Sequence, residues 1–301
     1  MILVVGATGR LGGNIARALI DNGKTVRVLL RDGGSFDDAR AETVHGDLKD
    51  PSSLRRACKG ADAVITSANA IAPRLAEDTI ESVDRLGNRN LIEAAQAEGV
   101  RHFVFVSVLG ASADHVAPFI QAKGETEEAL RESGLTWTIL QPDAFMDVWF
   151  PFVIGPAMRG GPVTLVGEGK RRHSMVAMQD VVGYAVAALE RRDAAANRVL
   201  AIGGEPVTWR DVIDTFAQVL GRQIDVRTVA PGEPVPGLPD FVAELLTSLE
   251  FYESPLVMSE LSRTFGVKTT SLKDFVRAFV TDFEQITQAR VPPNLVAPTS
   301  A

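Results

Sequence analysis

A glycine-rich stretch near the start of the chain has the residue types and the spacing of a phosphate-binding loop. The apolar run Ile2–Val5 leads directly into Gly6-Ala7-Thr8-Gly9-Arg10-Leu11-Gly12, and a helical pattern follows. In such a unit one glycine makes the tight turn, a second lets backbone N–H groups approach a diphosphate, and a third lets the helix pack on the strand. The N-terminus of the helix offers N–H groups and a positive dipole to phosphate. A plain strand-to-helix turn is the alternative. The residues predicted to contact a dinucleotide here are Gly6, Thr8, Gly9, Arg10, Leu11 and Gly12.

The end of the next apolar run indicates which dinucleotide fits. The run Val26–Leu30 ends at Arg31, and Asp32 follows. NAD enzymes usually place a carboxylate here for the ribose 2′-hydroxyl, whereas NADP enzymes tend to place an arginine nearby for the 2′-phosphate. A planar guanidinium suits a bidentate phosphate contact, and Arg10 can lie close to the same phosphate. We expect NADP (as NADPH) rather than NAD, with Asp32 serving NAD as the alternative.

Two later turns have residues suited to the rest of a dinucleotide. Gly46-Asp47-Leu48 follows the third strand pattern, and Asp47 is placed to accept a hydrogen bond from the adenine amino group; a turn-forming carboxylate is the alternative. Ser67 and Ala68 follow the fourth strand pattern. Their small side chains leave room for a cofactor at the sheet edge, where open α/β sheets bind ligands. We therefore add Asp47, Leu48, Ser67 and Ala68 to the predicted cofactor site.

These motifs lie in an alternation of strand and helix patterns. Strands are predicted at Ile2–Val5, Val26–Leu30, Thr43–His45, Ala63–Thr66, Phe103–Ser107 and Thr136–Leu140. Helices are predicted at Arg10–Asn22, Pro51–Cys58, Glu77–Glu98 and Phe119–Ser133. Strands that alternate with helices form βαβ units around a parallel sheet. The sequence therefore predicts an α/β, Rossmann-type, doubly wound NAD(P)-binding domain over residues 1–150.

After residue 150 the pattern changes, with more proline and glycine. Further elements are predicted at Gln179–Arg191, Arg198–Ile202, Thr208–Gly221, Phe241–Glu250 and Leu272–Phe283. We expect residues 151–290 to form a small C-terminal α+β lobe for substrate or interaction, which also contributes elements back to the Rossmann sheet. Residues 291–301 are expected to be a weakly ordered tail.

Composition excludes several classes of partner and site. The net charge is −7 and the longest basic run is only Lys170–Arg172, which argues against nucleic acid. Cys58 is the only cysteine, so neither an internal disulfide nor a multi-cysteine metal site is expected, and no metal is predicted. No apolar stretch approaches the roughly 20 residues of a membrane span. Met1 is followed by Ile2–Val5 without a basic region, unlike a signal peptide. We expect a cytoplasmic, soluble protein.

With these motifs together, the chain resembles the NmrA-like branch of the atypical short-chain dehydrogenases/reductases. The matching stretches cover most of residues 1–280 and are Gly6–Gly12, Leu30–Asp32, Gly46–Leu48, Asn90–Ala95, Phe103–Ser107, Lys123–Glu127, Leu135–Pro142, Asp180–Val182 and Thr208–Trp209. The resemblance implies a Rossmann domain, a small substrate lobe and an NAD(P) ligand. The family includes quinone, imine-type dye and phenylpropanoid reductases, and also redox-sensing regulators and structural subunits without turnover.

The catalytic residues of ordinary short-chain dehydrogenases are incomplete in this chain. Those enzymes use Tyr-x-x-x-Lys, whose tyrosine donates a proton to the carbonyl. Phe119 stands where the tyrosine would be, four residues before Lys123, and neither of the two tyrosines is followed by a lysine at that spacing. The standard alcohol-dehydrogenase mechanism is therefore excluded. The resemblance implies that Lys123 hydrogen-bonds the nicotinamide ribose and polarises a substrate oxygen; a surface lysine among glutamates is the alternative. Ser107 is expected to contact the cofactor.

An aromatic cluster after the sixth strand suggests where a substrate lies. Apolar pockets with few polar groups suit planar conjugated ligands. Packing between the two lobes is the alternative interpretation. The predicted substrate-pocket residues are Leu109, Phe119, Phe145, Met146, Trp149 and Phe150. The function expected is an NADPH-dependent reductase that transfers hydride to a small apolar conjugated acceptor such as a quinone or enone. The alternative is a non-catalytic NADP(H)-binding redox sensor or assembly factor with a protein partner.

Overall fold

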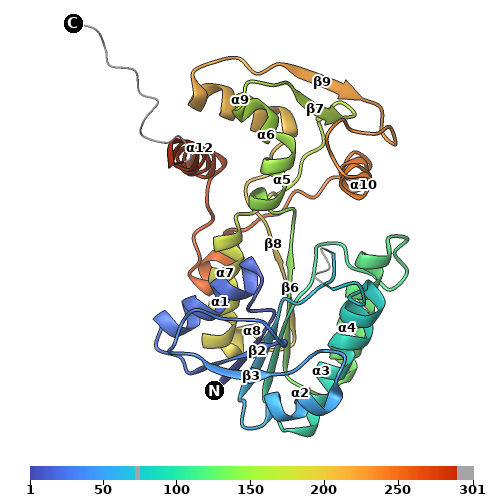
Figure 1. The fold of residues 1–301 in the computed structure, drawn as a ribbon, viewed down its shortest axis with the longest axis vertical. Coiled ribbons are helices and arrows are strands. Elements are labelled where there is room, and N and C mark those ends of the chain that lie inside the picture. The colour runs from blue at the N-terminus through green and yellow to red at the C-terminus, as the bar shows by residue number, and fades with distance from the viewer. Residues whose placement is uncertain (72–74, 290–301) are drawn as a thin grey trace, which may run out of the picture. The chain divides into compact units, whose positions relative to one another are not determined.

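A computed structural model describes residues 1–71 and 75–289, and these form two compact units (Figure 1). Unit 1 consists of residues 1–143, 178–202 and 257–268. Unit 2 consists of residues 144–177, 203–256 and 269–289. The chain passes between the units several times. The tail predicted at residues 291–301 lies outside the described residues.

Unit 1 is built on a seven-stranded sheet of order β3-β2-β1-β4-β5-β6-β8. The strands are β1 (Ile2–Val5), β2 (Val26–Leu30), β3 (Glu42–His45), β4 (Ala63–Thr66), β5 (His102–Val106), β6 (Trp137–Pro142) and β8 (Arg198–Ile202). Every neighbouring pair in this sheet is parallel. The chain order reverses between β1 and β4, and such a switch point is where open α/β sheets bind ligands. The predicted doubly wound Rossmann fold is confirmed.

Helices cover both faces of this sheet (Figure 1). They are α1 (Arg10–Asp21), α2 (Pro51–Cys58), the π-helical turn η1 (Ile80–Arg85), α3 (Leu86–Ala97), α4 (Pro118–Glu132), α7 (Met178–Glu190), α8 (Arg192–Ala195) and α11 (Ser259–Phe265). Helices α1 and α7 pack together on one side, and α2, α3 and α4 pack on the other. Where one helix was predicted from residue 77, the helical chain starts at Ile80, because Thr79 caps it by accepting a hydrogen bond from the Ser82 N–H.

The core of unit 1 explains why its central strands β1, β4 and β5 are almost entirely apolar. All four residues of β1 and of β4 are buried, as are all five of β5. Strands of a parallel sheet are covered on both faces, so their residues do not alternate between apolar and polar. Cys58 and His102 are buried in the same unit.

Unit 2 has helices packed with a small parallel sheet of β7 and β9. Its elements are α5 (Met146–Val153), α6 (Gly155–Met158), β7 (Val163–Val166), α9 (Trp209–Leu220), β9 (Val226–Val229), α10 (Asp240–Leu249) and α12 (Leu272–Ala289). The fully buried ring of Phe150 lies at the centre of its core, edge-on to Phe216 and Phe275. Within residues 1–71 and 75–289, no helix has both the length and the apolar character to cross a lipid bilayer.

Candidate dinucleotide-binding site

The glycine loop between β1 and α1 makes a turn that side chains would block. Gly6 has φ +89°, in the left-handed region, and its carbonyl accepts a hydrogen bond from the Gly9 N–H at 2.9 Å. A Cβ atom on Gly12 would lie 2.3 Å from the Gly6 oxygen and 2.7 Å from the Ser67 Oγ. Glycine at both positions therefore lets the first turn of α1 lie directly against the end of β1.

The N-terminus of α1 is suited to an anion. Its first N–H groups have no acceptor inside the helix, because the hydrogen bonds of an α-helix run back four residues. Gly9 is the cap residue and supplies no side-chain acceptor, and the first turn contains no acidic residue. A diphosphate would satisfy these donors and the positive end of the helix dipole. The loop and the helix terminus together fit the cofactor that the sequence predicts.

Residues after β4 form a second wall beside the glycine loop. A Cβ atom on Gly6 would lie 2.9 Å from the Ala68 nitrogen and 3.1 Å from the Ser67 Oγ. The structure thus brings Ser67 and Ala68 against the loop. Leu48 is buried and lies against Gly87 of α3. A Cβ atom on Gly87 would lie 2.8 Å from the Cβ atom of Leu48.

Arg31 lies at the end of β2 in a network of charges. Its Nη1 contacts Asp78 Oδ2 at 2.6 Å, and Lys49 Nζ contacts Asp78 Oδ1 at 2.7 Å. Burial opposes ionisation of Asp78, but the hydrogen bonds from Lys49 and Arg31 outweigh it and lower the pKa of Asp78 to about 2. Asp47 accepts the Lys49 backbone N–H at 2.8 Å, the arrangement of a turn-forming carboxylate. Asp32, the alternative that would serve NAD, has a fully exposed side chain.

Lys123 is buried in unit 1. Its side chain is 3% exposed, and its Nζ lies 3.3 Å from Oδ1 of Asp84, whose side chain is 0% exposed. The ammonium also lies 4.9 Å from the ring centre of Phe105 and 5.4 Å from that of Phe119, distances at which a cation is attracted to an aromatic face. The alternative of a solvated lysine among glutamates therefore does not describe this residue.

Asp84 connects Lys123 to the loop after β4. Its Oδ2 accepts the Ala70 N–H at 2.8 Å, and its backbone oxygen accepts the Thr126 hydroxyl at 3.0 Å and the Asn88 amide at 3.0 Å. Within the described residues, Oδ1 contacts Lys123 without forming a hydrogen bond. Asp84 belongs to the π-helical turn η1, and such turns occur frequently at functional sites. No motif in the sequence predicted this pair.

Ser107 uses both of its donors inside the protein. Its hydroxyl donates to the buried Glu127, which also accepts from Gln141 at 2.8 Å and from Arg131 at 2.7 Å. Its backbone N–H donates to the Leu140 oxygen at 2.8 Å. The hydroxyl oxygen can still accept a hydrogen bond, so the predicted contact of Ser107 with a cofactor stays a prediction. Leu109 is half-buried two residues further on.

The aromatic cluster belongs to unit 2, apart from Phe119. Phe150 is fully buried and Met146 is 2% exposed, so both are core residues. Phe145 and Trp149 are half-buried, and Trp149 packs against the same core. The alternative interpretation, that these residues serve packing, is supported for Met146 and Phe150, which pack within unit 2. Phe119 is a half-buried residue of α4 in unit 1.

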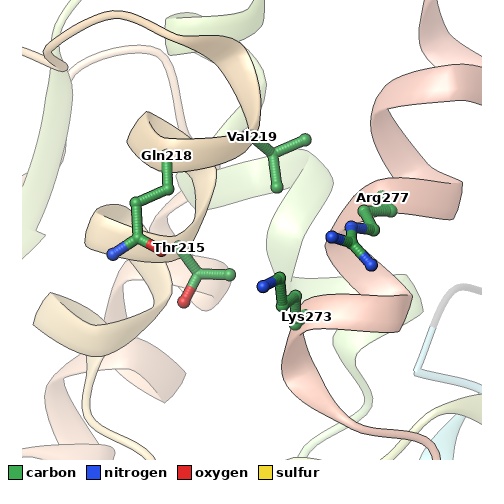
Figure 2. Close-up of a pocket in the computed structure, with 5 residues that line it drawn as sticks. All are labelled: Thr215, Gln218, Val219, Lys273 and Arg277. Atoms are coloured by element: carbon green, nitrogen blue, oxygen red, sulfur yellow. The ribbon is translucent and has the colours of Figure 1, made fainter.

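Unit 2 also has a groove between α9 and α12 (Figure 2). Its volume is about 330 Å³, and it is lined by Thr215, Gln218, Val219, Lys273 and Arg277. Four of these five residues are polar or charged, and two of them are cations, which does not suit an apolar conjugated acceptor. None of the residues predicted to form a site lines it.

The chain is similar to several known proteins and matches one family model. Photosystem II assembly factor Ycf39 of Synechocystis sp. is 33% identical over 231 residues, which are 76% of this chain and 70% of that protein. A (4-alkanoyl-5-oxo-2,5-dihydrofuran-3-yl)methyl phosphate reductase of Streptomyces griseus is 33% identical over 227 residues, 74% of this chain and 75% of that protein. The solved structure of Citrobacter sp. triphenylmethane reductase complexed with NADP(H) shares the fold, with a TM-score of 0.78 at 21% identity over 92% of this chain and 99% of that one. A family model described as NAD(P)H-binding matches residues 6–192, and the chain belongs to this family.

Proposed function

We propose that this protein is an NADPH-dependent reductase that transfers hydride to an electron-poor conjugated acceptor, such as a quinone or an enone. Membership of the NAD(P)H-binding family supports the cofactor class. The likeness to a protein named as a dihydrofuran phosphate reductase, and the shared fold with one named as a triphenylmethane reductase, support a reductase. Arg31 at the end of β2 supports NADPH over NADH, because a guanidinium pairs with a 2′-phosphate.

The observation that carries this proposal is the buried ammonium of Lys123 beside Phe119. The ammonium of Lys123, whose side chain is 3% exposed, pairs with the Asp84 carboxylate and has further N–H groups for a ligand. In the proposed site these groups hold the nicotinamide ribose, while the N-terminus of α1 holds the diphosphate. The dinucleotide supplies the hydride, and the protein supplies orientation and electrostatics.

Phenylalanine at position 119 favours a conjugated acceptor over a simple ketone. Its ring lies 5.4 Å from Lys123 Nζ but has no hydroxyl, so this position has no group that donates a proton to a carbonyl oxygen. In a quinone or an enone the negative charge that develops on oxygen is delocalised by conjugation. Such an acceptor needs less proton donation during the hydride step than a simple ketone does.

A second candidate function is a non-catalytic NADP(H)-binding assembly factor or redox sensor. The observation that favours it is the 33% identity to a protein named as a photosystem II assembly factor. Such a protein needs the glycine loop and Arg31 but no acceptor site. It would bind NADPH and change its partner or its assembly state between NADPH and NADP⁺.

Turnover of NADPH with a panel of quinones and enones separates the two functions. A reductase consumes NADPH with some member of the panel, measured by the loss of NADPH absorbance. Lys123→Met should then lower the rate about ten- to a hundredfold, because one charge-assisted hydrogen bond contributes roughly 1.5–3 kcal/mol. Phe119→Tyr should raise the reduction of simple ketones relative to quinones. The exposed Lys59→Met is the control. Tight NADPH binding without oxidation by any acceptor, together with an assembly state that differs between NADPH and NADP⁺, would refute the reductase.

A further inference from the structure

Arg31 shares its partner with a second cation. Asp78 binds Arg31 through Oδ2 at 2.6 Å and Lys49 through Oδ1 at 2.7 Å. Since both oxygens belong to one carboxylate, the guanidinium and the ammonium lie side by side. The Asp78 side chain is 5% exposed, whereas those of Arg31 and Lys49 are 33% and 28% exposed. The two cations therefore reach solvent while the acid that holds them does not.

The strand order explains why these two residues meet. Strands β2 and β3 are parallel neighbours with Leu30 opposite His45, and the Gly46 N–H donates to the Leu30 oxygen at 2.9 Å. The turns that follow the two strands therefore leave the same edge of the sheet. A Cβ atom on Gly34 would lie 3.0 Å from the Arg31 oxygen and 3.7 Å from the Thr8 Cγ2, so the turn after β2 lies against the glycine loop.

The charges in this cluster are balanced. Lys49 Nζ also lies 3.4 Å from Asp47 Oδ2, so two cations face two carboxylates. Burial disfavours the charged form of Lys49, but Asp78 and Asp47 outweigh it and raise the pKa of Lys49. Lys49 therefore stays charged at neutral pH. Loss of either cation would leave a net negative cluster, which repels a phosphate dianion.

We propose that Lys49 is the second cation of a 2′-phosphate site and that it sets, together with Arg31, the preference for NADPH over NADH. An ammonium has three N–H donors, so Lys49 can donate to a phosphate while it contacts Asp78 and Asp47. This inference rests on the NADPH part of the proposed function and is independent of the acceptor. If the cluster were only a structural ion-pair network, Lys49 would affect both cofactors equally or not at all.

The test measures dissociation constants of NADPH and NADH for the full chain by isothermal titration calorimetry. Lys49→Ala should weaken NADPH binding about ten- to a hundredfold, as expected for a hydrogen bond to a charged group, and change NADH binding by less than about twofold. Lys49→Arg should retain most of the preference, since it keeps the charge. The control is Lys59→Ala, which removes another exposed lysine of unit 1. A thermal melt of each variant checks that it is folded.

Ionic strength gives a second measurement on the unaltered protein. Because Arg31 and Lys49 are partly exposed, salt should narrow the gap between the NADPH and NADH affinities of the wild type, and should narrow it less in Lys49→Ala. If Lys49→Ala weakens the binding of NADPH and NADH equally, Lys49 contacts the diphosphate that both cofactors share or has only a structural role. That result would overturn the proposal. A ratio of NADPH to NADH dissociation constants that is the same in Lys49→Ala as in the wild type would also overturn it. Absence of turnover with every acceptor would refute the reductase while leaving these binding ratios unaffected.

Discussion

Replacing Lys123 by methionine removes the ammonium but keeps an unbranched side chain of similar length. The carboxylate of Asp84 then remains in a site where its side chain is 0% exposed. Its Oδ2 keeps the Ala70 N–H, but its Oδ1 loses the cation that faces it. The converse substitution, Asp84→Asn, leaves the ammonium of Lys123 buried without an opposite charge. Each single substitution thus leaves one uncompensated charge away from water.

The size of the loss follows from this burial. Removing one partner of a buried ion pair typically costs about 3–5 kcal/mol, because the remaining charge stays desolvated. In a unit of this size 1 kcal/mol changes Tm by roughly 2–4 °C, so each single variant should melt roughly 6–20 °C lower. The double variant Lys123→Met/Asp84→Asn has no buried charge at the pair. We expect it to be more stable than the sum of the two single losses predicts, by about 2–3 kcal/mol.

A double-mutant cycle measured by urea unfolding and circular dichroism gives this coupling energy. Arg89 and Glu93 on α3 provide the matched control, because they form an exposed pair at 3.8 Å with side chains 68% and 66% exposed. Their coupling should be about 0.5 kcal/mol or less, as for other exposed pairs four residues apart on a helix. If the losses at Lys123 and Asp84 simply add, or if their coupling is no larger than that of the control, the buried ion pair described above is wrong.

Two further predictions concern the glycine loop and pH. Gly12→Ala should weaken NADPH binding at least about tenfold by calorimetry, since its Cβ would lie 2.3 Å from the Gly6 oxygen, whereas Gly155→Ala has room and is the control. Burial, aided by Arg192, lowers the pKa of His102 to about 4 from 6.5. The folded protein favours the neutral form of His102, so this group contributes its full stabilisation above pH 6.5. The free energy of unfolding should fall by about 3 kcal/mol as the pH drops from 6.5 to 4. A His102→Gln variant that keeps the whole pH slope in urea unfolding would contradict this assignment.

The sheet of unit 1 was predictable because burial on both faces leaves apolar runs that end at turn residues. The predicted bounds of β1, β2, β4 and β8 match the structure. Unit 2 was harder to predict because the sequence patterns of some of its elements differ from those typical of helices and strands. Helix α5 contains Pro151, and the residues of β9 are mostly exposed, so neither has the usual pattern of its element. Helix α5 is stabilised by the packing of its buried residues, and β9 by its backbone pairing with β7, rather than by local preference.

The glycine loop could be predicted from the sequence, whereas the partners of Lys123 and Lys49 could not. A loop that binds diphosphate needs glycines at fixed spacing, and that requirement is local. Asp84 lies far from Lys123 in the chain, and the two meet only because η1 packs against α4. Lys49 and Asp78 meet for a similar reason, at the edge formed by neighbouring strands. A weak signal existed for Lys49, which directly follows the Gly46–Leu48 turn.

The aromatic cluster was ambiguous for a different reason. Met146, Trp149 and Phe150 recur at helical spacing, and apolar residues at that spacing line a core as readily as a ligand pocket. Burial decides for Met146 and Phe150, which pack inside unit 2. The buried charge of Lys123 is more informative than an apolar residue. Replacing a buried ion pair by well-packed apolar residues is often neutral or stabilising, so folding alone does not explain the presence of Lys123 and Asp84. Asp84 pairs with this ammonium and also accepts the Ala70 N–H in the loop after β4. A buried ammonium in this position is explained if it binds the cofactor, and this reasoning makes Lys123 the residue on which the proposed reductase depends.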